Sequence, residues 1–173
     1  SLFKSIESAT DYILVNFFIV KNDRVGIAFR DALIAKAREG VRVSFLFDEI
    51  GSHKLGRGYL RAMREAGIVY SAFGTNRHWW SRFQLNFRNH RKIVVVDGRL
   101  GYIGGHNVGD EYLGLKPPLA PWRDTHIEVS GPVLTSLQES FAEDWFWATG
   151  QILSDLTWTP TPSEQGNIPV LVV

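Results

Sequence analysis

The sequence contains no cysteine among its 173 residues, which excludes a disulfide framework and a thiolate metal cluster. Its formal net charge is only +1, whereas a nucleic-acid-binding domain usually carries a clear excess of Lys and Arg. Long apolar runs are also missing. The longest, from Tyr12 to Val20, has nine residues and includes Asn16, but a membrane-spanning helix needs about 20. We therefore expect any basic surface to be local and no segment of this chain to cross a membrane.

The apolar residues are numerous enough for one domain with a real core, since 45% of the chain is hydrophobic and 13% aromatic. Strands are expected at 12–18, 41–47, 68–73, 91–97, 100–103 and 125–129, and helices at 24–39, 55–66 and 133–148. The first part alternates strand and helix, which favours an α/β fold with a mixed, largely parallel central sheet and helices on both faces. Asp97-Gly98 is a strong hairpin signal.

One short stretch carries most of the chemistry. His90, Lys92, Asp97, Gly105 and Asn107 fit the pattern H-x-K-x4-D-x7-G-x-N. The apolar run after Lys92 predicts a buried strand, on which positions two apart share a face, so His90 and Lys92 are expected to point the same way. An imidazole can act as a nucleophile or proton carrier near neutral pH, and an ammonium beside it can hold a phosphate oxygen.

Gly104, Gly105 and Asp97 accompany His90 and Lys92 in this part of the sequence. Gly104 and Gly105 either let the backbone approach an anion or simply allow a tight strand end. Asp97 stands an odd number of positions from both His90 and Lys92, so it should face away from them. We count Asp97 with the catalytic set because it belongs to the pattern, but expect it to hydrogen bond to backbone at the turn.

A carboxylate outside the pattern is a candidate partner for the imidazole. Asp124 lies at the mouth of the strand predicted at 125–129, where it could accept a hydrogen bond from the His90 ring and set its tautomer. The alternative for Asp124 is an exposed charge at a strand edge. His126 and Glu128 are expected on an ordinary solvated face, and Glu111 is expected to cap a helix.

The pattern resembles the HKD signature of the phospholipase D superfamily. Three longer stretches, 85–92 (LNFRNHRK), 104–114 (GGHNVGDEYLG) and 122–126 (WRDTH), resemble the first catalytic half of bacterial cardiolipin synthases. The resemblance runs from about Asp11 to Val173. Nucleases, phospholipases and transferases share the short signature, so the longer stretches are what favour the lipid enzyme.

This resemblance implies a phospholipase D-like domain and a site built from two facing halves. One His attacks phosphorus and the other protonates the leaving alcohol, so that a phosphohistidine passes a phosphatidyl group between two phosphatidylglycerol molecules to give cardiolipin and glycerol. Lys92 and Asn107 would hold phosphate oxygens, and His90 would be the nucleophile or the general acid. The resemblance implies no metal and no cofactor.

Only one half is present in this sequence. The other four histidines are followed two positions later by Leu55, Trp80, Val108 and Glu128, so none begins a second H-x-K. We expect residues 1–150 to be the first HKD domain, and residues 151–173 to be a linker and the start of a strand leading to a missing second HKD domain. The resemblance implies an excised piece, inactive alone, of a protein anchored in the bacterial cell membrane through segments absent here. Its partners would be phosphatidylglycerol or another phospholipid, the membrane surface, and the second domain or a second copy as a homodimer.

Other functions remain open from the residues alone. A homodimeric phospholipase D-like phosphodiesterase or nuclease is one, and a domain that binds phospholipid or a partner chain without turnover is another. The mixed aromatic and basic segment 77–91 suits a membrane interface, single-stranded nucleic acid or a core flanked by solvated Arg. The low net charge argues against a nucleic-acid partner. No histidine pair has the i, i+4 helical spacing of a zinc site, so no metal site is expected.

Overall fold

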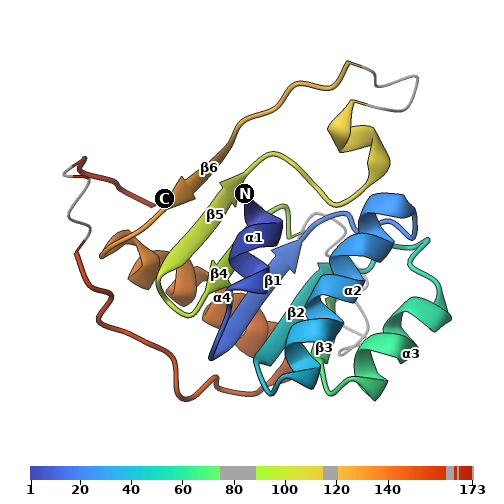
Figure 1. The fold of residues 1–173 in the computed structure, drawn as a ribbon, viewed down its shortest axis with the longest axis horizontal. Coiled ribbons are helices and arrows are strands. Elements are labelled where there is room, and N and C mark those ends of the chain that lie inside the picture. Colours follow the sequence, from blue (N-terminus) through green and yellow to red (C-terminus); the bar gives the residue numbers. More distant parts are fainter. Residues whose placement is uncertain (75–88, 115–120, 163–165, 167, 173) are drawn as a thin grey trace, which may run out of the picture.

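The computed structural model describes residues 1–74, 89–114, 121–162, 166 and 168–172. A six-stranded sheet in the order β3-β2-β1-β4-β5-β6 runs through the molecule, with helices on both of its faces (Figure 1). The strands are β1 (Tyr12–Phe17), β2 (Arg42–Asp48), β3 (Val69–Phe73), β4 (Ile93–Val96), β5 (Leu100–Gly104) and β6 (His126–Val129). The helices are α1 (Leu2–Glu7), α2 (Arg24–Arg38), α3 (Arg57–Glu65), the 3-10 turn η2 (Asp110–Leu113) and α4 (Val133–Thr149).

Strand β1 is buried on both faces, which explains its continuous apolar run. Ile13, Val15 and Phe17 belong to the core that α1, α2 and α3 cover. Tyr12 and Leu14 point to the other face and pack in the core under α4. The sheet therefore separates two hydrophobic cores, and β1 contributes to both.

The α/β fold class is confirmed, but parallel pairing is confined to one half of the sheet. β1, β2 and β3 are parallel because α2 and α3 supply the crossovers, whereas β4 pairs antiparallel with both β1 and β5, and β5 pairs antiparallel with β6. The cause at β4 and β5 is the predicted hairpin. Asp97 and Gly98 both have positive φ, 52° and 61°, and the Arg99 N–H donates to the Val96 carbonyl at 2.9 Å, which closes a tight turn between the paired Val96 and Leu100.

This topology brings distant segments to one edge of the sheet, namely the edge formed by the carboxyl ends of β1 and β5. Because β4 is antiparallel to β1 and β5, the segment before β4 lies beside the segments that follow β1 and β5. The segment before β6 joins them, since β6 is antiparallel to β5. Residues near 18–21, 89–92, 104–107 and 124–126 therefore meet at this edge, and Asp97 lies at the opposite one.

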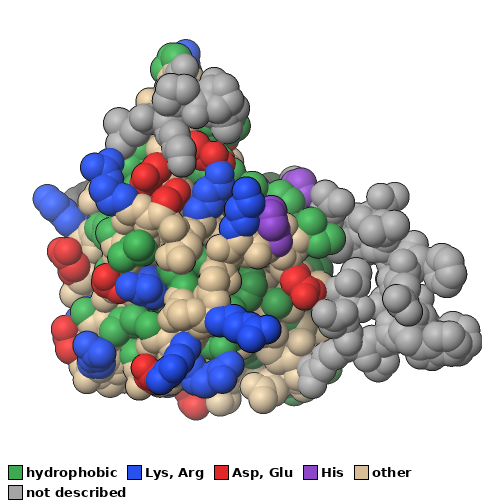
Figure 2. All heavy atoms as spheres, turned by 90° about the vertical axis from the view of Figure 1, so that its right-hand side faces the viewer, with side chains coloured by type: hydrophobic (Ala, Val, Ile, Leu, Met, Phe, Trp, Pro, Cys, Tyr) green, Lys and Arg blue, Asp and Glu red, His purple; other side chains and the backbone are tan. Residues whose placement is uncertain are grey.

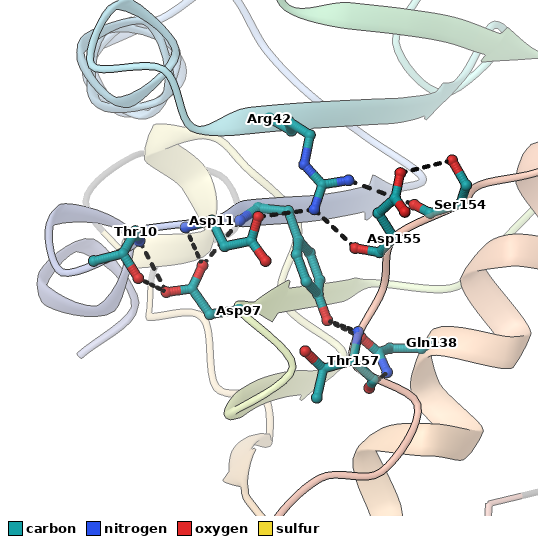
Figure 3. Close-up of polar contacts among 9 residues, drawn as sticks. Thr10, Asp11, Arg42, Asp97, Gln138, Ser154, Asp155 and Thr157 are labelled. Atoms are coloured by element: carbon teal, nitrogen blue, oxygen red, sulfur yellow. Dashed lines mark hydrogen bonds and ion pairs between the residues drawn. The ribbon is translucent and has the colours of Figure 1, made fainter.

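The described residues after α4 are irregular, as a linker would be, but several of them are bound to the domain (Figure 3). The backbone N–H of Thr157 donates to the Tyr12 hydroxyl at 3.1 Å, and Gln138 Nε2 donates to the Thr157 carbonyl at 2.8 Å. Arg42 donates to the Asp155 carbonyl at 2.8 Å. Residues 168–172 form no strand here, so a strand continuing into a further domain stays a prediction.

Candidate active site

His90 and Lys92 lie just before β4, not on the strand as expected, because β4 begins at Ile93. They nevertheless meet at one ring. The His90 imidazole stacks on Phe18, with 4.1 Å between ring centroids and 23° between planes. The Lys92 ammonium lies 5.6 Å from the centroid of the same ring and donates to the His90 carbonyl at 2.6 Å. Both side chains thus approach one aromatic ring, although neither lies on a strand face as expected.

The electrostatics around Lys92 suit an anion. Burial lowers the pKa of the Lys92 ammonium, and the negative charge of Asp124 opposes this shift. The His90 imidazole beside it is exposed. A half-buried cation next to an exposed imidazole can hold a phosphate oxygen while the ring reaches phosphorus.

Asn107 ties two of the converging segments together. Its Oδ1 accepts a hydrogen bond from the Ile19 N–H at 3.0 Å, and Val108 exchanges backbone hydrogen bonds with Ile19 and Lys21, each 3.0 Å long. Burial raises the pKa of the Tyr112 hydroxyl to about 12, with a hydrogen bond from Asn107 opposing it. The amide nitrogen of Asn107 is thus the group that can donate to a phosphate oxygen.

Gly104 and Gly105 are explained by close packing. A Cβ at Gly104 would lie 2.3 Å from the Thr125 carbonyl oxygen, and one at Gly105 would lie 2.0 Å from Asp124 Oδ1. The Gly105 N–H donates to the Thr125 carbonyl at 2.9 Å, so it is already used. The paired glycines let the segment before β6 close on the end of β5, which favours the tight strand end over an anion cradle.

Asp124 lies close to Gly105 and acts on Lys92 through its charge. Its Oδ1 accepts a hydrogen bond from the neighbouring Thr125 N–H at 2.7 Å. Within the described part of the chain, no hydrogen bond joins Asp124 to His90. Its role in setting the imidazole tautomer therefore stays a prediction, while its negative charge opposes the lowering of the Lys92 pKa by burial.

Asp97 is not brought together with His90 and Lys92. Its carboxylate accepts hydrogen bonds of 2.8–2.9 Å from the backbone N–H groups of Thr10, Asp11 and Tyr12, and one of 3.0 Å from the Thr10 hydroxyl (Figure 3). The expected hydrogen bonding of Asp97 to backbone is confirmed. The N–H groups that it binds belong to the connection between α1 and β1, however, and not to the turn that contains Asp97. Burial raises the pKa of Asp97, but these hydrogen bonds outweigh it and hold the pKa below the ordinary value.

Two further histidines lie near this edge and were not predicted as site residues. The rings of His106 and His126 are stacked at 5.9 Å, and neither buried ring nitrogen of His126 has a hydrogen-bond partner in the described structure. Burial lowers the pKa of His126, and His106 lowers it further. The solvated face expected for His126 is therefore wrong, because β6 pairs with β5 and places the His126 ring directly against Gly104. Alternation on a strand could not reveal which face is covered.

Other sequence expectations also changed. Glu111 forms an ion pair with Lys21 and caps no helix, since no side chain caps η2. Phe18 and Asp144 hold the segment around His90. Neither residue belongs to a motif that could be recognised in the sequence. Most of the aromatic and basic segment, residues 77–88, lies outside the described residues.

A hollow of about 630 Å³ opens beside His90, within the usual range for a ligand pocket. The Phe73 and Trp147 rings, stacked at 4.5 Å, form its apolar wall. The full lining is Phe73, Asn89, His90, Arg91, Glu143, Asp144 and Trp147. The hollow gives His90 a neighbouring space with both apolar and charged walls.

This face of the molecule carries charged side chains of both signs. In Figure 2, histidine side chains lie near Lys and Arg, and cations are interspersed with acidic and hydrophobic side chains over this face. Among the described residues, no group of three or more His, Asp or Glu is placed to hold a metal ion. Every helix in that part of the chain is too short or too polar to span a bilayer.

Comparison with known proteins gives a consistent result. A family model described as "Cardiolipin synthase, PLD-like domain" matches residues 2–145. Cardiolipin synthase A from Pseudomonas putida is 59% identical over 152 residues, which cover 88% of this chain and 32% of that protein. The enzyme of the same name from Pseudomonas syringae pv. syringae is also 59% identical, with the same coverage. The chain thus spans about a third of the length of these relatives.

Solved structures share the fold at low sequence identity. Nuc from Salmonella typhimurium, a phospholipase D family member, has a TM-score of 0.59 at 20% identity, and the match covers 85% of this chain and 86% of Nuc. Phosphatidylserine synthase from Haemophilus influenzae has a TM-score of 0.61 at 16% identity, over 80% of this chain and 32% of that enzyme. These likenesses concern the arrangement of the backbone alone.

Proposed function

Because the chain belongs to the cardiolipin synthase family of phospholipase D-like domains, we propose that it supplies one half of a phosphatidyltransferase site. The reaction transfers a phosphatidyl group between two phosphatidylglycerol molecules and yields cardiolipin and glycerol. The observation that carries this proposal is the convergence of His90 and Lys92 on Phe18, at the sheet edge that also holds Asn107.

In this proposal His90 forms and breaks the bond to phosphorus. In one step a ring nitrogen bonds to phosphorus, the bond from phosphorus to the glycerol oxygen breaks, and that oxygen takes a proton. In the second step the hydroxyl of the acceptor lipid loses its proton and displaces the imidazole. If His90 is instead the general acid, it supplies the proton of the first step. Lys92 neutralises charge on the phosphate oxygens in both steps.

The facing half of the site comes from elsewhere. This chain carries one His, one Lys and one Asn of the pattern, and the proposed reaction uses two of each. We assign the second set to a further HKD domain of a longer protein, or to a second copy of this chain. The relatives are about three times longer than the matched region, which supports the first source. Since the substrates are lipids, the complete protein is proposed to act at the bacterial cell membrane.

The test uses the full polypeptide that carries this sequence, mixed with vesicles of phosphatidylglycerol. Thin-layer chromatography and mass spectrometry should detect cardiolipin and an equal amount of released glycerol. A parallel reaction with single-stranded DNA, resolved on a gel, should show no cleavage. DNA cleavage without cardiolipin would support the nuclease alternative, and lipid binding without either product would support a non-enzymatic domain.

A further inference from the structure

One carboxylate on α4 holds both neighbours of His90. Asp144 Oδ2 accepts a hydrogen bond from Asn89 Nδ2 at 2.7 Å, and Asp144 Oδ1 accepts one from Arg91 Nη1 at 2.6 Å. Within the segment, Asn89 Oδ1 accepts a hydrogen bond from the Arg91 N–H at 3.0 Å. The chain on either side of His90 is therefore fixed to the same anchor, while the His90 ring itself remains exposed.

The anchor is buried and charged. Asp144 and Asn89 are 7% and 5% exposed. Asn16 on β1 adds a third donor, with its Nδ2 3.0 Å from Asp144 Oδ2. A buried carboxylate is costly unless it is paired and hydrogen bonded, and here the Arg91 guanidinium and the two amides meet both needs. In an Asp144→Asn variant, an NH2 group would replace one of the two carboxylate oxygens. Its N–H groups would then face a donor that bonds to that oxygen in the wild type.

We propose that Asp144 is a positioning residue for His90. The inference rests on the proposed function, since it concerns the residue expected to bond to phosphorus. Asp144 acts through Asn89 and Arg91, which hold the backbone at positions 89 and 91 and so keep the imidazole against Phe18. A small displacement of a reacting group lowers the rate strongly even when the substrate still binds. The expected signature is a loss of kcat with little change in KM.

The central experiment compares Asp144→Asn with the wild type in the full polypeptide. We expect kcat for cardiolipin formation to fall about 10- to 100-fold, since a misplacement of a reacting group by about 1 Å can cost about 100-fold in rate, with KM changed less than about threefold. Gln138→Ala is the matched control, because Gln138 is a buried polar residue of the same helix whose hydrogen bonds go to Tyr12 and Thr157 and not to the neighbours of His90. It should lower the unfolding temperature but keep kcat within about twofold.

A second variant keeps the proposal testable if Asp144→Asn does not fold. The Arg91 side chain is 49% exposed, so Arg91→Gln removes the ion pair at the surface of the network. Its kcat should fall about tenfold. The proposal is overturned if the folded variants keep the wild-type kcat, or if Gln138→Ala loses as much kcat as Asp144→Asn.

The two proposals can fail separately. All variants, with His90→Ala as the inactive reference, are also measured on bis(p-nitrophenyl) phosphate, a simple phosphodiester. A wild type that cleaves this ester but makes no cardiolipin overturns the proposed function alone. A wild type that makes cardiolipin, beside an Asp144→Asn variant of equal kcat, overturns the positioning role alone.

Discussion

The imidazole of His90 stacks on the ring of Phe18, with 4.1 Å between centroids. Phe18 directly follows β1, a strand that is buried along its whole length. The His90 ring therefore rests against the end of a buried central strand, although His90 belongs to the segment before β4. Lys92 uses the same ring, so one aromatic side chain aligns both groups.

Replacing His90 by Ala should abolish phosphatidyl transfer and leave the fold intact. The ring is exposed and its described contact is the stack on Phe18, so its loss removes little packing. Cardiolipin formation by the full polypeptide is measured together with the thermal unfolding curve. Near-normal product from a folded His90→Ala protein would exclude the proposed function.

Replacing Phe18 by Leu should lower kcat by about 3- to 10-fold, because an aromatic stack contributes roughly 0.5–1.5 kcal/mol beyond its buried area. The variant keeps an apolar side chain at this half-buried position. Phe3→Leu is the matched control, since Phe3 packs edge-on against Phe29 in the α1–α2 region. Equal kcat values for both variants and the wild type would show that the stack does not align His90.

Replacing Asp124 by Asn should lower turnover without removing lipid binding and should shift the alkaline limb of activity. Burial lowers the pKa of Lys92 and Asp124 opposes this, so removing the carboxylate lowers the pKa further. The protonated ammonium, which holds the phosphate, is lost as pH rises through its pKa. The kcat of Asp124→Asn should therefore decline at a lower pH than that of the wild type. An unchanged profile and turnover would make Asp124 an ordinary surface charge.

Replacing Asp97 by Asn should reduce stability and leave kcat within about twofold. The pKa of Asp97 is held below 3.8 because, although burial raises it, hydrogen bonds from Thr10, Asp11 and Tyr12 outweigh that effect. A carboxylate with a lowered pKa stabilises the fold above its unfolded pKa, and this contribution is lost as pH falls through the folded value. Hydrogen bonds to a charged acceptor suggest a loss of roughly 2–3 kcal/mol near neutral pH.

The Asp97→Asn prediction is measured by urea unfolding at several pH values. Asn tolerates the positive φ of this position, so the turn is preserved. The difference between wild type and variant should shrink as pH falls below about 4, because the unfolded chain then takes up the proton first and the folded carboxylate follows at its lower pKa. Asp31→Asn, an exposed carboxylate on α2, serves as the control. A constant difference at all pH values would mean that the charge of Asp97 contributes nothing.

The 173-residue chain alone should be nearly inactive as a monomer. A monomer lacks the catalytic histidine of the facing half, which would act as the general acid for the leaving alcohol. General acid assistance is typically worth about 10²–10⁴-fold. Phe146 and Trp147 on α4 are each 54% exposed, and apolar surface of this kind favours association. Light scattering over a dilution series, with a phosphodiester turnover assay, should show activity only in a dimer or larger species. Full activity in a strict monomer would exclude the two-half site.

Local patterns in the sequence were sufficient for several features. The strand and helix alternation predicted the α/β fold because apolar periodicity follows from local geometry. Asp97-Gly98 predicted the hairpin because both residues adopt positive φ readily. The pattern around His90 and Lys92 indicated the family. These features depend on residues that are near each other in the chain.

Only the tertiary structure decided which distant residues complete the site. The antiparallel insertion of β4 beside β1 places Phe18 under His90 and sends Asp97 to the opposite edge. The packing of α4 brings Asp144 to the segment around His90. Such contacts depend on how strands pair and how helices cover a sheet, and many pairings satisfy the same periodicity. The physical reason is that the sequence specifies which faces are apolar, whereas burial of all those faces at once selects their partners.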